Sequence, residues 1–361
     1  MAKNELVIVA LSGGVDSAVS ALVLKNAGYQ VECLHMSNWE DDGYCESAKD
    51  FQDARQVCQK LKLPLHRVNF SNPYKEKVFS NFLDECRLGR TPNPDVLCNK
   101  EIKFKAFLKH AENLGAKKIA TGHYARINSM GNSTQLLKSV DNNKDQSYFL
   151  CCLNQSQLHK TLFPIGNLYK NDVRKLAKDS DLVTHNKKDS TGICFIGEQP
   201  FRNFLSNFIQ PQRGLIKTVD GKTIGEHDGI FFYTLGQRQG LGIGGVKNAT
   251  DAPWYVVKKE IDNNELIVAQ DHDHPLLHNK NLTVLDINWI LEEIPELPFK
   301  CTAKCRYRQS DQNCTIEIDK NNQFIVNFES SQRAITPCLL YTSDAADEGL
   351  GVDLGGRSII K

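Results

Sequence analysis

The segment Ser12–Ser17, which reads Ser-Gly-Gly-Val-Asp-Ser, constrains the fold of this chain most strongly. It follows an apolar run, Leu6–Leu11, and precedes a helical pattern from Ala18 to Gly28. A buried strand that breaks at paired glycines and restarts as a helix directs backbone N–H groups and the positive helix end toward one point, which suits a phosphate. Within the segment, the Asp carboxylate and the last Ser hydroxyl can share a magnesium ion with such phosphates.

The glycine spacing separates this segment from two common nucleotide loops. No Gly-Lys-Ser/Thr follows, as it does in a Walker loop, and the glycines are adjacent, unlike those of the Rossmann fingerprint. The segment instead resembles the PP-loop of ATP pyrophosphatases, enzymes that transfer AMP to an oxygen and release pyrophosphate. An ordinary strand–turn–helix connection rich in Gly and Ser is the alternative.

The first two hundred residues alternate apolar runs with helical patterns, which predicts an α/β fold: a parallel sheet with helices on both faces. Ligands of such sheets lie beyond the carboxyl ends of the strands, where the Ser12–Ser17 segment is placed. The predicted strands are Leu6–Leu11, Val31–Met36, Leu65–Phe70 and Lys118–Thr121, and the predicted helices are Ala18–Ala27, Ala48–Leu61, Tyr74–Leu88, Glu101–Leu114 and Lys170–Ser180. A hairpin is predicted from Tyr124 to Ser139.

A chain of 361 residues exceeds one typical core, so several domains are expected. The predicted division is a PP-loop ATP-binding catalytic domain over 1–200, a small β-rich domain over 201–274, and an antiparallel β-barrel over 275–337. Many glycines punctuate short β-type runs after Phe201, and from Asn281 onward apolar and polar residues alternate at regular intervals. Residues 338–361 are expected to be a tail that does not belong to the natural chain.

Composition excludes several classes of protein. Hydrophobic residues make up 40% and charged residues 24%, as in soluble globular proteins, and no apolar stretch approaches the roughly 20 residues that span a bilayer. The amino terminus runs straight into the first strand, so we expect no signal peptide and a cytoplasmic location. The twelve cysteines are scattered, so we expect most to be reduced and buried, with weak support for a zinc site.

Two cysteines lie in segments that suit chemistry. In Thr91–Phe104, two prolines rigidify a loop, and Asp95 and Cys98 stand three apart where the next helix begins. There the helix dipole acidifies a thiol, and the carboxylate can exchange protons with it or with a substrate. In Asp189–Gly197, flanking glycines can turn Cys194 outward. Inert buried cysteines are the alternative at both places.

Several further motifs accompany these segments in the same order along the chain. Together they resemble the bacterial tRNA-specific 2-thiouridylases over residues 5–337. The motifs are Ser12–Ser17, Met36–Glu40, Pro92–Cys98, Thr121–Arg126, Lys144–Phe149, Ser190–Gly197, Tyr233–Gly245 and Arg306–Arg308.

The resemblance implies ATP with Mg²⁺ as a substrate and no permanently bound metal or iron–sulfur cluster. ATP activates the 2-carbonyl of a wobble uridine as an adenylate, and the magnesium ion lies near Asp16 and Ser17. The implied ATP-binding residues are Ala10, Leu11, Ser12, Gly13, Gly14, Val15, Asp16, Ser17, Met36 and Gly122.

The resemblance also implies how sulfur arrives. Cys194 carries a persulfide received from a sulfur donor protein, either a cysteine desulfurase or a relay protein, and Cys98 completes the transfer. The persulfide attacks the ring directly, or Cys98 first releases hydrosulfide; both routes end in a transient Cys98–Cys194 disulfide. Asp95 acts as general acid or base, and Asn93 and Pro94 contact the target base with it.

The implied partner is a tRNA with a wobble uridine, whose flipped base needs a positive surface around it. The expected tRNA-binding residues are His123, Lys144, Asp145, Gln146, Arg306 and Tyr307. The family also has a tRNA-contacting Gln within Thr-Pro-Gly-Gln near its carboxyl end. Here Thr336-Pro337 is followed by Cys338-Leu339, and the sequence beyond resembles a translated sequencing adapter.

Three other functions remain open from the residues. A PP-loop amidotransferase or ligase, such as a GMP or NAD synthetase, shares Ser12–Ser17 but needs no reactive cysteines. A thiolase with an iron–sulfur cluster needs clustered Cys-x-x-Cys ligands, which this sequence lacks. A non-catalytic tRNA-binding protein that keeps an ATP site is the third.

Overall fold

The computed structural model describes most of the chain. The described residues are 5–39, 47–189, 200–244, 250–284, 287–337, 341–344 and 351–353.

The amino-terminal part is built on a five-stranded parallel sheet with the order β3-β2-β1-β4-β7. Its strands are β1 (Leu6–Ala10), β2 (Gln30–Ser37), β3 (Leu65–Asn69), β4 (Lys118–Ala120) and β7 (Thr161–Leu162). The chain runs from β1 through β2 to β3 on one side and then returns to the other side of β1 with β4. The order therefore reverses between β1 and β4, and ligands of parallel sheets lie at such a point.

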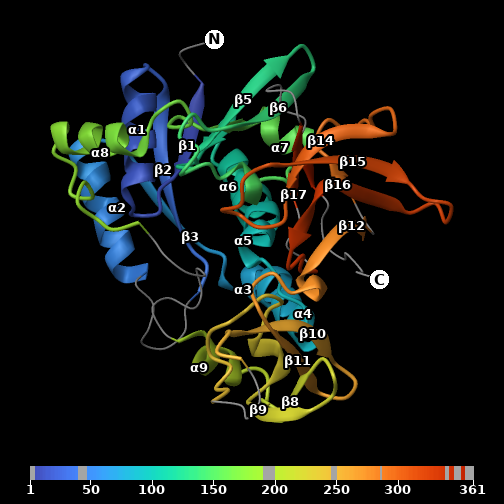
Figure 1. The fold of residues 1–361 in the computed structure, drawn as a ribbon. Coiled ribbons are helices and arrows are strands. Elements are labelled where there is room, and N and C mark those ends of the chain that lie inside the picture. Colours follow the sequence, from blue (N-terminus) through green and yellow to red (C-terminus); the bar gives the residue numbers. More distant parts are fainter. Residues whose placement is uncertain are drawn as a thin grey trace.

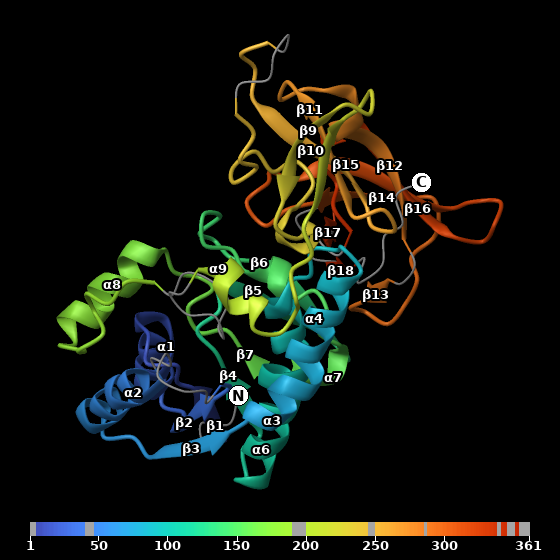
Figure 2. The ribbon, with the colours of Figure 1, turned by 90° about the horizontal axis from the view of Figure 1, so that it is seen from below.

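Helices cover both faces of this sheet. Helices α1, α2 and α8 lie together in both ribbon views, while α3, α4 and α6 lie on another side of the sheet (Figure 1, Figure 2). The helices are α1 (Val15–Asn26), α2 (Ser47–Leu61), α3 (Ser71–Tyr74), α4 (Ser80–Arg87), α5 (Pro94–Leu97), α6 (Phe107–Asn113), α7 (Gln155–His159), α8 (Lys170–Asp179) and α9 (Phe201–Ser206). Two π-helical segments, Lys75–Phe79 and Cys98–Ala106, continue α3 into α4 and α5 into α6, and short 3₁₀ turns occur at Ser147–Phe149, Ile230–Phe232 and Pro275–Leu277.

Strand β1 shows why its apolar run is continuous. Val7 and Val9 are fully buried in the core that contains residues of α1, α2 and α8, whereas Ile8 is fully buried in the core on the opposite face. Successive side chains of a strand point to opposite faces, so a strand covered on both sides needs apolar residues at every position. The predicted parallel sheet with two helical layers is confirmed.

The central part is a four-stranded sheet with the order β10-β11-β8-β9. Its strands are β8 (Gly214–Thr218), β9 (Thr223–His227), β10 (Trp254–Glu260) and β11 (Glu265–Gln270), and the separate hairpin of β5 (Ala125–Met130) and β6 (Ser133–Lys138) forms as predicted. Phe204, Ile216 and Val256 belong to the same buried cluster as Ile8. The central sheet thus packs on the amino-terminal part through one shared core.

The carboxyl-terminal part is an antiparallel sheet, as predicted, with the order β12-β16-β15-β14-β17-β18-β13 and a core of its own. Its strands are β12 (His278–Val284), β13 (Asn288–Trp289), β14 (Phe299–Lys304), β15 (Gln312–Ile318), β16 (Phe324–Arg333), β17 (Tyr341–Asp344) and β18 (Gly351–Asp353). Strand β17 pairs with β14, and β18 pairs with β13.

One helix begins earlier than its pattern predicts. The expected helix Glu101–Leu114 is the end of a longer helical stretch that begins at Pro94. Pro94 is the first helical residue, where its fixed φ is favourable, and the Asn93 side chain accepts a hydrogen bond from the Asp95 amide at 3.2 Å. Because the stretch starts at Pro94, Asp95 and Cys98 both lie within its first two turns.

Candidate active site

The Ser12–Ser17 loop joins β1 to α1, and hydrogen bonds of its two serines fix its conformation. The Ser12 amide donates to Ser17 Oγ at 3.2 Å, Ser17 Oγ donates to the Gly14 carbonyl at 3.1 Å, and the two hydroxyl oxygens lie 3.1 Å apart. Helix α1 begins at Val15, and its N-cap residue, Gly14, offers no side chain to the first amides. Those amides are therefore available to an anion at the positive end of the helix.

Gly13 and helix α2 fix the outer side of the loop. Gly13 has a φ of +84°, and a Cβ there would lie 2.3 Å from the Asp50 carbonyl oxygen, so only glycine fits. Lys187 Nζ donates to the Gly13 carbonyl at 3.1 Å and pairs with Asp50 at 2.7 Å. Burial alone would lower the pKa of Lys187, but the hydrogen bonds that it donates to Asp50 and Asp53 raise its pKa, which favours the charged form.

Gly122 closes the loop from the neighbouring strand. It follows β4, which pairs with β1, and a Cβ at Gly122 would lie 2.7 Å from the Ser17 amide nitrogen and 2.8 Å from the Asp16 carbonyl carbon. Met36 lies half-buried near the carboxyl end of β2. The predicted ATP-binding residues Ala10 to Ser17, Met36 and Gly122 therefore share one edge of the sheet.

The Asp16 carboxylate has two partners that sequence reasoning missed. Lys170 Nζ donates to both Asp16 oxygens, at 2.7 and 2.8 Å, and the Tyr124 hydroxyl donates to one of them at 2.9 Å. Lys170 is the first residue of α8, where the helix dipole disfavours a cation. A lysine at a predicted helix start was the signal available in the sequence.

The predicted thiol and carboxylate lie on one helical stretch, but in different surroundings. Cys98 is 2% exposed and belongs to the main core, whereas Asp95 is partly exposed. Asn99 Nδ2, next to Cys98, donates to the Phe149 carbonyl at 2.8 Å. Cys98 is the first residue of the nine-residue π-helical segment, a conformation that is frequent at functional sites.

Asp95 lies in an environment that keeps it protonated to higher pH. Burial raises the pKa of Asp95, and the nearby charge of Lys103 opposes the rise. Burial and the same lysine lower the pKa of His123 well below its usual value. The His123 ring lies 5.8 Å from that of Phe104, centroid to centroid, and its Nδ1 is 2.8 Å from Thr121 Oγ1. His123 thus connects the Gly122 loop with the helical stretch of Asp95.

The residues predicted to bind tRNA lie in three segments, which contact one another through Gln146 and Tyr307. Asp145 is buried and accepts from the Ser139 amide and the Ser147 hydroxyl, while Gln146 Oε1 accepts from the Tyr124 amide at 3.0 Å. The Tyr307 ring, from the loop after β14, lies 4.5 Å from the Phe149 ring.

The packing of Tyr307 brings the carboxyl-terminal sheet to the helix of Asp95. Tyr307 packs against a small cluster that includes Val96 and Tyr148. Arg306 Nη2 donates to the carbonyls of Leu235 and Ala334 at 2.9 and 3.1 Å. The carboxyl-terminal sheet therefore lies beside the helix of Asp95 through Tyr307, and Arg306 links that sheet to the central part at Leu235.

Cys194 lies outside the described residues. The segment that contains it is preceded by Asp189, which is described and lies among three cations. Lys144 Nζ is 2.7 Å from Asp189, Lys170 Nζ 2.8 Å and Arg174 Nη2 2.8 Å. Although burial opposes it, the hydrogen bonds from Lys144 and Lys170 lower the pKa of Asp189 to about 2.

Comparison with known proteins decides between the functions left open. Three family models match: the "tRNA methyl transferase HUP domain" over residues 5–198, the "tRNA methyl transferase PRC-barrel domain" over 202–270 and the "Aminomethyltransferase beta-barrel domain" over 279–349. The tRNA-specific 2-thiouridylase MnmA of Legionella pneumophila is 57% identical over 92% of this chain and 92% of its own length. That of Francisella tularensis subsp. novicida is 50% identical over 99% of this chain and all of its own.

The chain belongs to the tRNA-specific 2-thiouridylase family. Two of the matching family models are described as tRNA methyl transferase domains. The relatives, however, match this chain at 50–57% identity over nearly the full length, and they are named as 2-thiouridylases. The relatives therefore decide the activity. The chain is an enzyme that thiolates tRNA. Among solved structures, the U34-tRNA thiolase NcsA from Methanococcus maripaludis is 19% identical with a TM-score of 0.35, covering 56% of this chain and 63% of its own, and carries no argument here.

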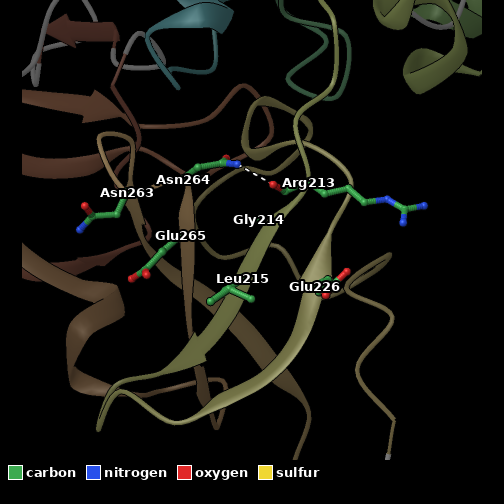
Figure 3. Close-up of a pocket in the computed structure, with 7 residues that line it drawn as sticks. All are labelled: Arg213, Gly214, Leu215, Glu226, Asn263, Asn264 and Glu265. Atoms are coloured by element: carbon green, nitrogen blue, oxygen red, sulfur yellow. Dashed lines mark hydrogen bonds between the residues drawn. The ribbon is translucent and has the colours of Figure 1, made fainter.

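A separate pocket of about 310 Å³ lies on the central sheet of this 2-thiouridylase (Figure 3). Its lining residues are Arg213, Gly214, Leu215, Glu226, Asn263, Asn264 and Glu265. Asn264 Nδ2 donates to the Arg213 carbonyl at 2.9 Å, which ties the two sides of the pocket together. The pocket includes none of the predicted site residues.

The described ranges contain neither a membrane-spanning helix nor a cluster of metal ligands. Among their helices, none is both long and apolar enough to cross a bilayer. Within the same ranges, no three His, Cys, Asp or Glu residues gather as ligands for a metal ion. Asp16 and Ser17 are oxygen donors at the phosphate loop, and they suit a magnesium ion that arrives with a nucleotide.

Replacing Gly122 with alanine tests the contact between the two strand ends. The added Cβ meets backbone atoms of Asp16 and Ser17, so we expect Gly122→Ala to lower the free energy of unfolding by about 1–3 kcal/mol and to weaken ATP binding. Urea unfolding and calorimetry measure the two effects. Gly244→Ala is the matched control, because a Cβ there meets nothing within 4 Å. If Gly122→Ala and Gly244→Ala changed the free energy of unfolding and the ATP affinity equally, the close contact of Gly122 with Asp16 and Ser17 would be contradicted.

The partly buried carboxylate of Asp95 predicts a pH dependence of stability. Because the pKa of Asp95 is raised on folding, the folded state binds its proton more tightly than the unfolded state does. The free energy of unfolding of the wild type should therefore fall, relative to that of Asp95→Asn, as pH rises from about 4 to the raised pKa. Urea titrations at several pH values measure this difference. A difference that does not change with pH would show that Asp95 is not desolvated.

Proposed function

We propose that this 2-thiouridylase acts by adenylating the C2 oxygen of a wobble uridine with ATP and then replacing that oxygen with sulfur. One observation carries the proposal: the phosphate loop after β1, the Gly122–His123 segment after β4 and the helix of Asp95 gather at one edge of the sheet. A nucleotide on the loop then presents its α-phosphate toward a base that lies against Asp95.

The first step forms one bond and breaks one. The uridine C2 oxygen attacks the α-phosphorus of ATP, the bond to the bridging oxygen breaks, and pyrophosphate leaves. The α1 amides and the magnesium ion near Asp16 and Ser17 stabilise the charge on the leaving phosphates. Asp95 exchanges the proton of the base, and the raised pKa of Asp95 supports this role because it lies nearer to neutral pH.

The second step transfers sulfur. The terminal sulfur of a Cys194 persulfide attacks C2, and AMP leaves with the former C2 oxygen. The Cys98 thiolate then attacks Cys194 Sγ, which releases the sulfur on the base and forms the Cys98–Cys194 disulfide. Alternatively, Cys98 attacks first and releases hydrosulfide, which attacks C2. In both routes a dithiol reductant restores the two thiols.

The burial of Cys98 supports this division of roles. At 2% exposure, its sulfur lies in the core, where a donor protein does not reach it directly. The thiol that receives sulfur from a cysteine desulfurase or a relay protein is therefore assigned to Cys194. Cys98 acts inside the site, after the base has entered.

The tRNA is proposed to lie across all three parts of the chain, in the cytoplasm. His123 and Lys144 to Gln146 contact it from the amino-terminal part, and Arg306 and Tyr307 contact it from the carboxyl-terminal sheet. The packing of Tyr307 on Phe149 supports a continuous surface. Asn93 and Pro94 contact the flipped base beside Asp95.

Serine substitutions test the two thiols. We expect Cys98→Ser and Cys194→Ser each to lower tRNA thiolation more than a hundredfold, while pyrophosphate release on the first turnover continues, because adenylation needs no thiol. Retardation of the tRNA in a mercury-containing gel measures thiolation. The control is Cys86→Ser, since burial raises the pKa of Cys86 to about 12 and leaves it unreactive.

Two results would contradict the proposal. Thiolation that persists in both variants would show that the cysteines carry no sulfur. Normal tRNA binding by the wild type with no thiolation, when a persulfide donor and ATP are supplied, would favour a non-catalytic tRNA-binding protein.

The origin of residues 338–361 stays a prediction. The family match extends to residue 349, and strands β17 and β18 lie within this tail. Sequencing the genomic locus tests the prediction: a reading frame that continues unchanged through Cys338 would show that the tail is natural.

A further inference from the structure

Lys170 is a buried cation beside the phosphate loop. The residue is 8% exposed, and its ammonium group lies 2.7 and 2.8 Å from the Asp16 oxygens and 2.8 Å from Asp189. It also lies 5.7 Å from the centre of the Tyr124 ring. Both ribbon views place α8, which starts at Lys170, beside α1, which starts one residue before Asp16 (Figure 1, Figure 2).

Fold stability alone does not account for this placement. A cation in the first turn of a helix opposes the dipole of that helix, and an ammonium group removed from water loses hydration that an ion pair does not always restore. The Lys170 amide is held separately, since it donates to the Asp141 carboxylate at 2.9 Å. The backbone of α8 is thus anchored at this point without the help of the charged end.

We propose that Lys170 binds the phosphates of ATP that leave as pyrophosphate. Asp16 would hold the magnesium ion of a bound nucleotide, and the Lys170 ammonium group, released from Asp16, would turn to a phosphate oxygen. Asp189 keeps its contact with Lys170 during this exchange. The inference rests on the proposed use of ATP.

The charges around Asp189 support the exchange. Asp189 contacts Lys144 and Arg174 in addition to Lys170. Its pKa is lowered to about 2, so it remains ionised while a phosphate approaches. Lys170 therefore keeps a carboxylate partner close to the loop when it leaves Asp16.

Ligand binding to the full-length protein tests the proposal. Calorimetry with Mg-ATP, AMP and inorganic pyrophosphate is performed on the wild type, Lys170→Gln and Lys170→Arg. We expect Lys170→Gln to weaken ATP and pyrophosphate by about tenfold or more, as for the loss of a hydrogen bond to a charged group, and AMP by less than about twofold. Lys170→Arg should recover part of the loss. The matched control is Lys175→Gln, an exposed lysine of the same helix.

A second pair of variants tests the proposal even if Lys170→Gln does not fold. Removing Lys170 alone leaves the Asp16 carboxylate with the Tyr124 hydroxyl but without its cation, whereas Asp16→Asn and Asp16→Asn/Lys170→Gln avoid that charge. Pyrophosphate should bind more weakly to the double variant than to Asp16→Asn. Circular dichroism and the unfolding midpoint confirm that both variants are folded.

The outcomes separate this proposal from the use of ATP. Equal losses for ATP and AMP, or an unchanged ratio of their affinities, would overturn the role of Lys170 while leaving the ATP site intact. A wild type that binds neither Mg-ATP nor pyrophosphate would overturn the proposed use of ATP and this role together.

Discussion

The parallel pairing of β1 with β4 is the constraint on which the site depends. It places the end of β1, where the phosphate loop begins, beside the end of β4, where Gly122 and His123 follow. Gly122 fits so closely against Asp16 and Ser17 that a single added carbon would meet their backbone. Because the His123 ring also lies beside that of Phe104, on the helical stretch that carries Asp95, a shift between these two strands would separate the Ser12–Ser17 loop from the helix of Asp95.

The fold of the amino-terminal part follows from sequence patterns that have a direct physical cause. Val7, Ile8 and Val9 are all apolar because both faces of β1 are covered, and paired glycines end the strand where helix α1 begins. Periodicity alone gave the range Glu101–Leu114, which starts too late, whereas the position of Asp95 and Cys98 after two prolines already indicated the helix start that the Asn93 N-cap and Pro94 fix. The packing of Tyr307 on Phe149 joins residues far apart in sequence, and no local pattern encodes such a contact.

Local motifs of the site were predicted from the sequence, whereas contacts between residues distant in the chain were missed. Ser12 to Ser17 and the Asp95–Cys98 spacing are local motifs, so the sequence shows them directly. Lys170 and Tyr124 were missed because their partner, Asp16, is distant in the chain, and only the fold brings the three together. The pKa values of two carboxylates are shifted in opposite directions. Cations lower the pKa of Asp189 and keep it ionised, whereas partial desolvation raises the pKa of Asp95.

An isotope measurement tests the central claim, adenylation of the base, most directly. A tRNA anticodon arm that carries oxygen-18 at C2 of the wobble uridine is incubated with the enzyme, ATP and a persulfide donor, and the AMP is analysed by mass spectrometry. The account predicts one oxygen-18 atom in the AMP for each 2-thiouridine formed. Thiolated product together with unlabelled AMP would contradict it.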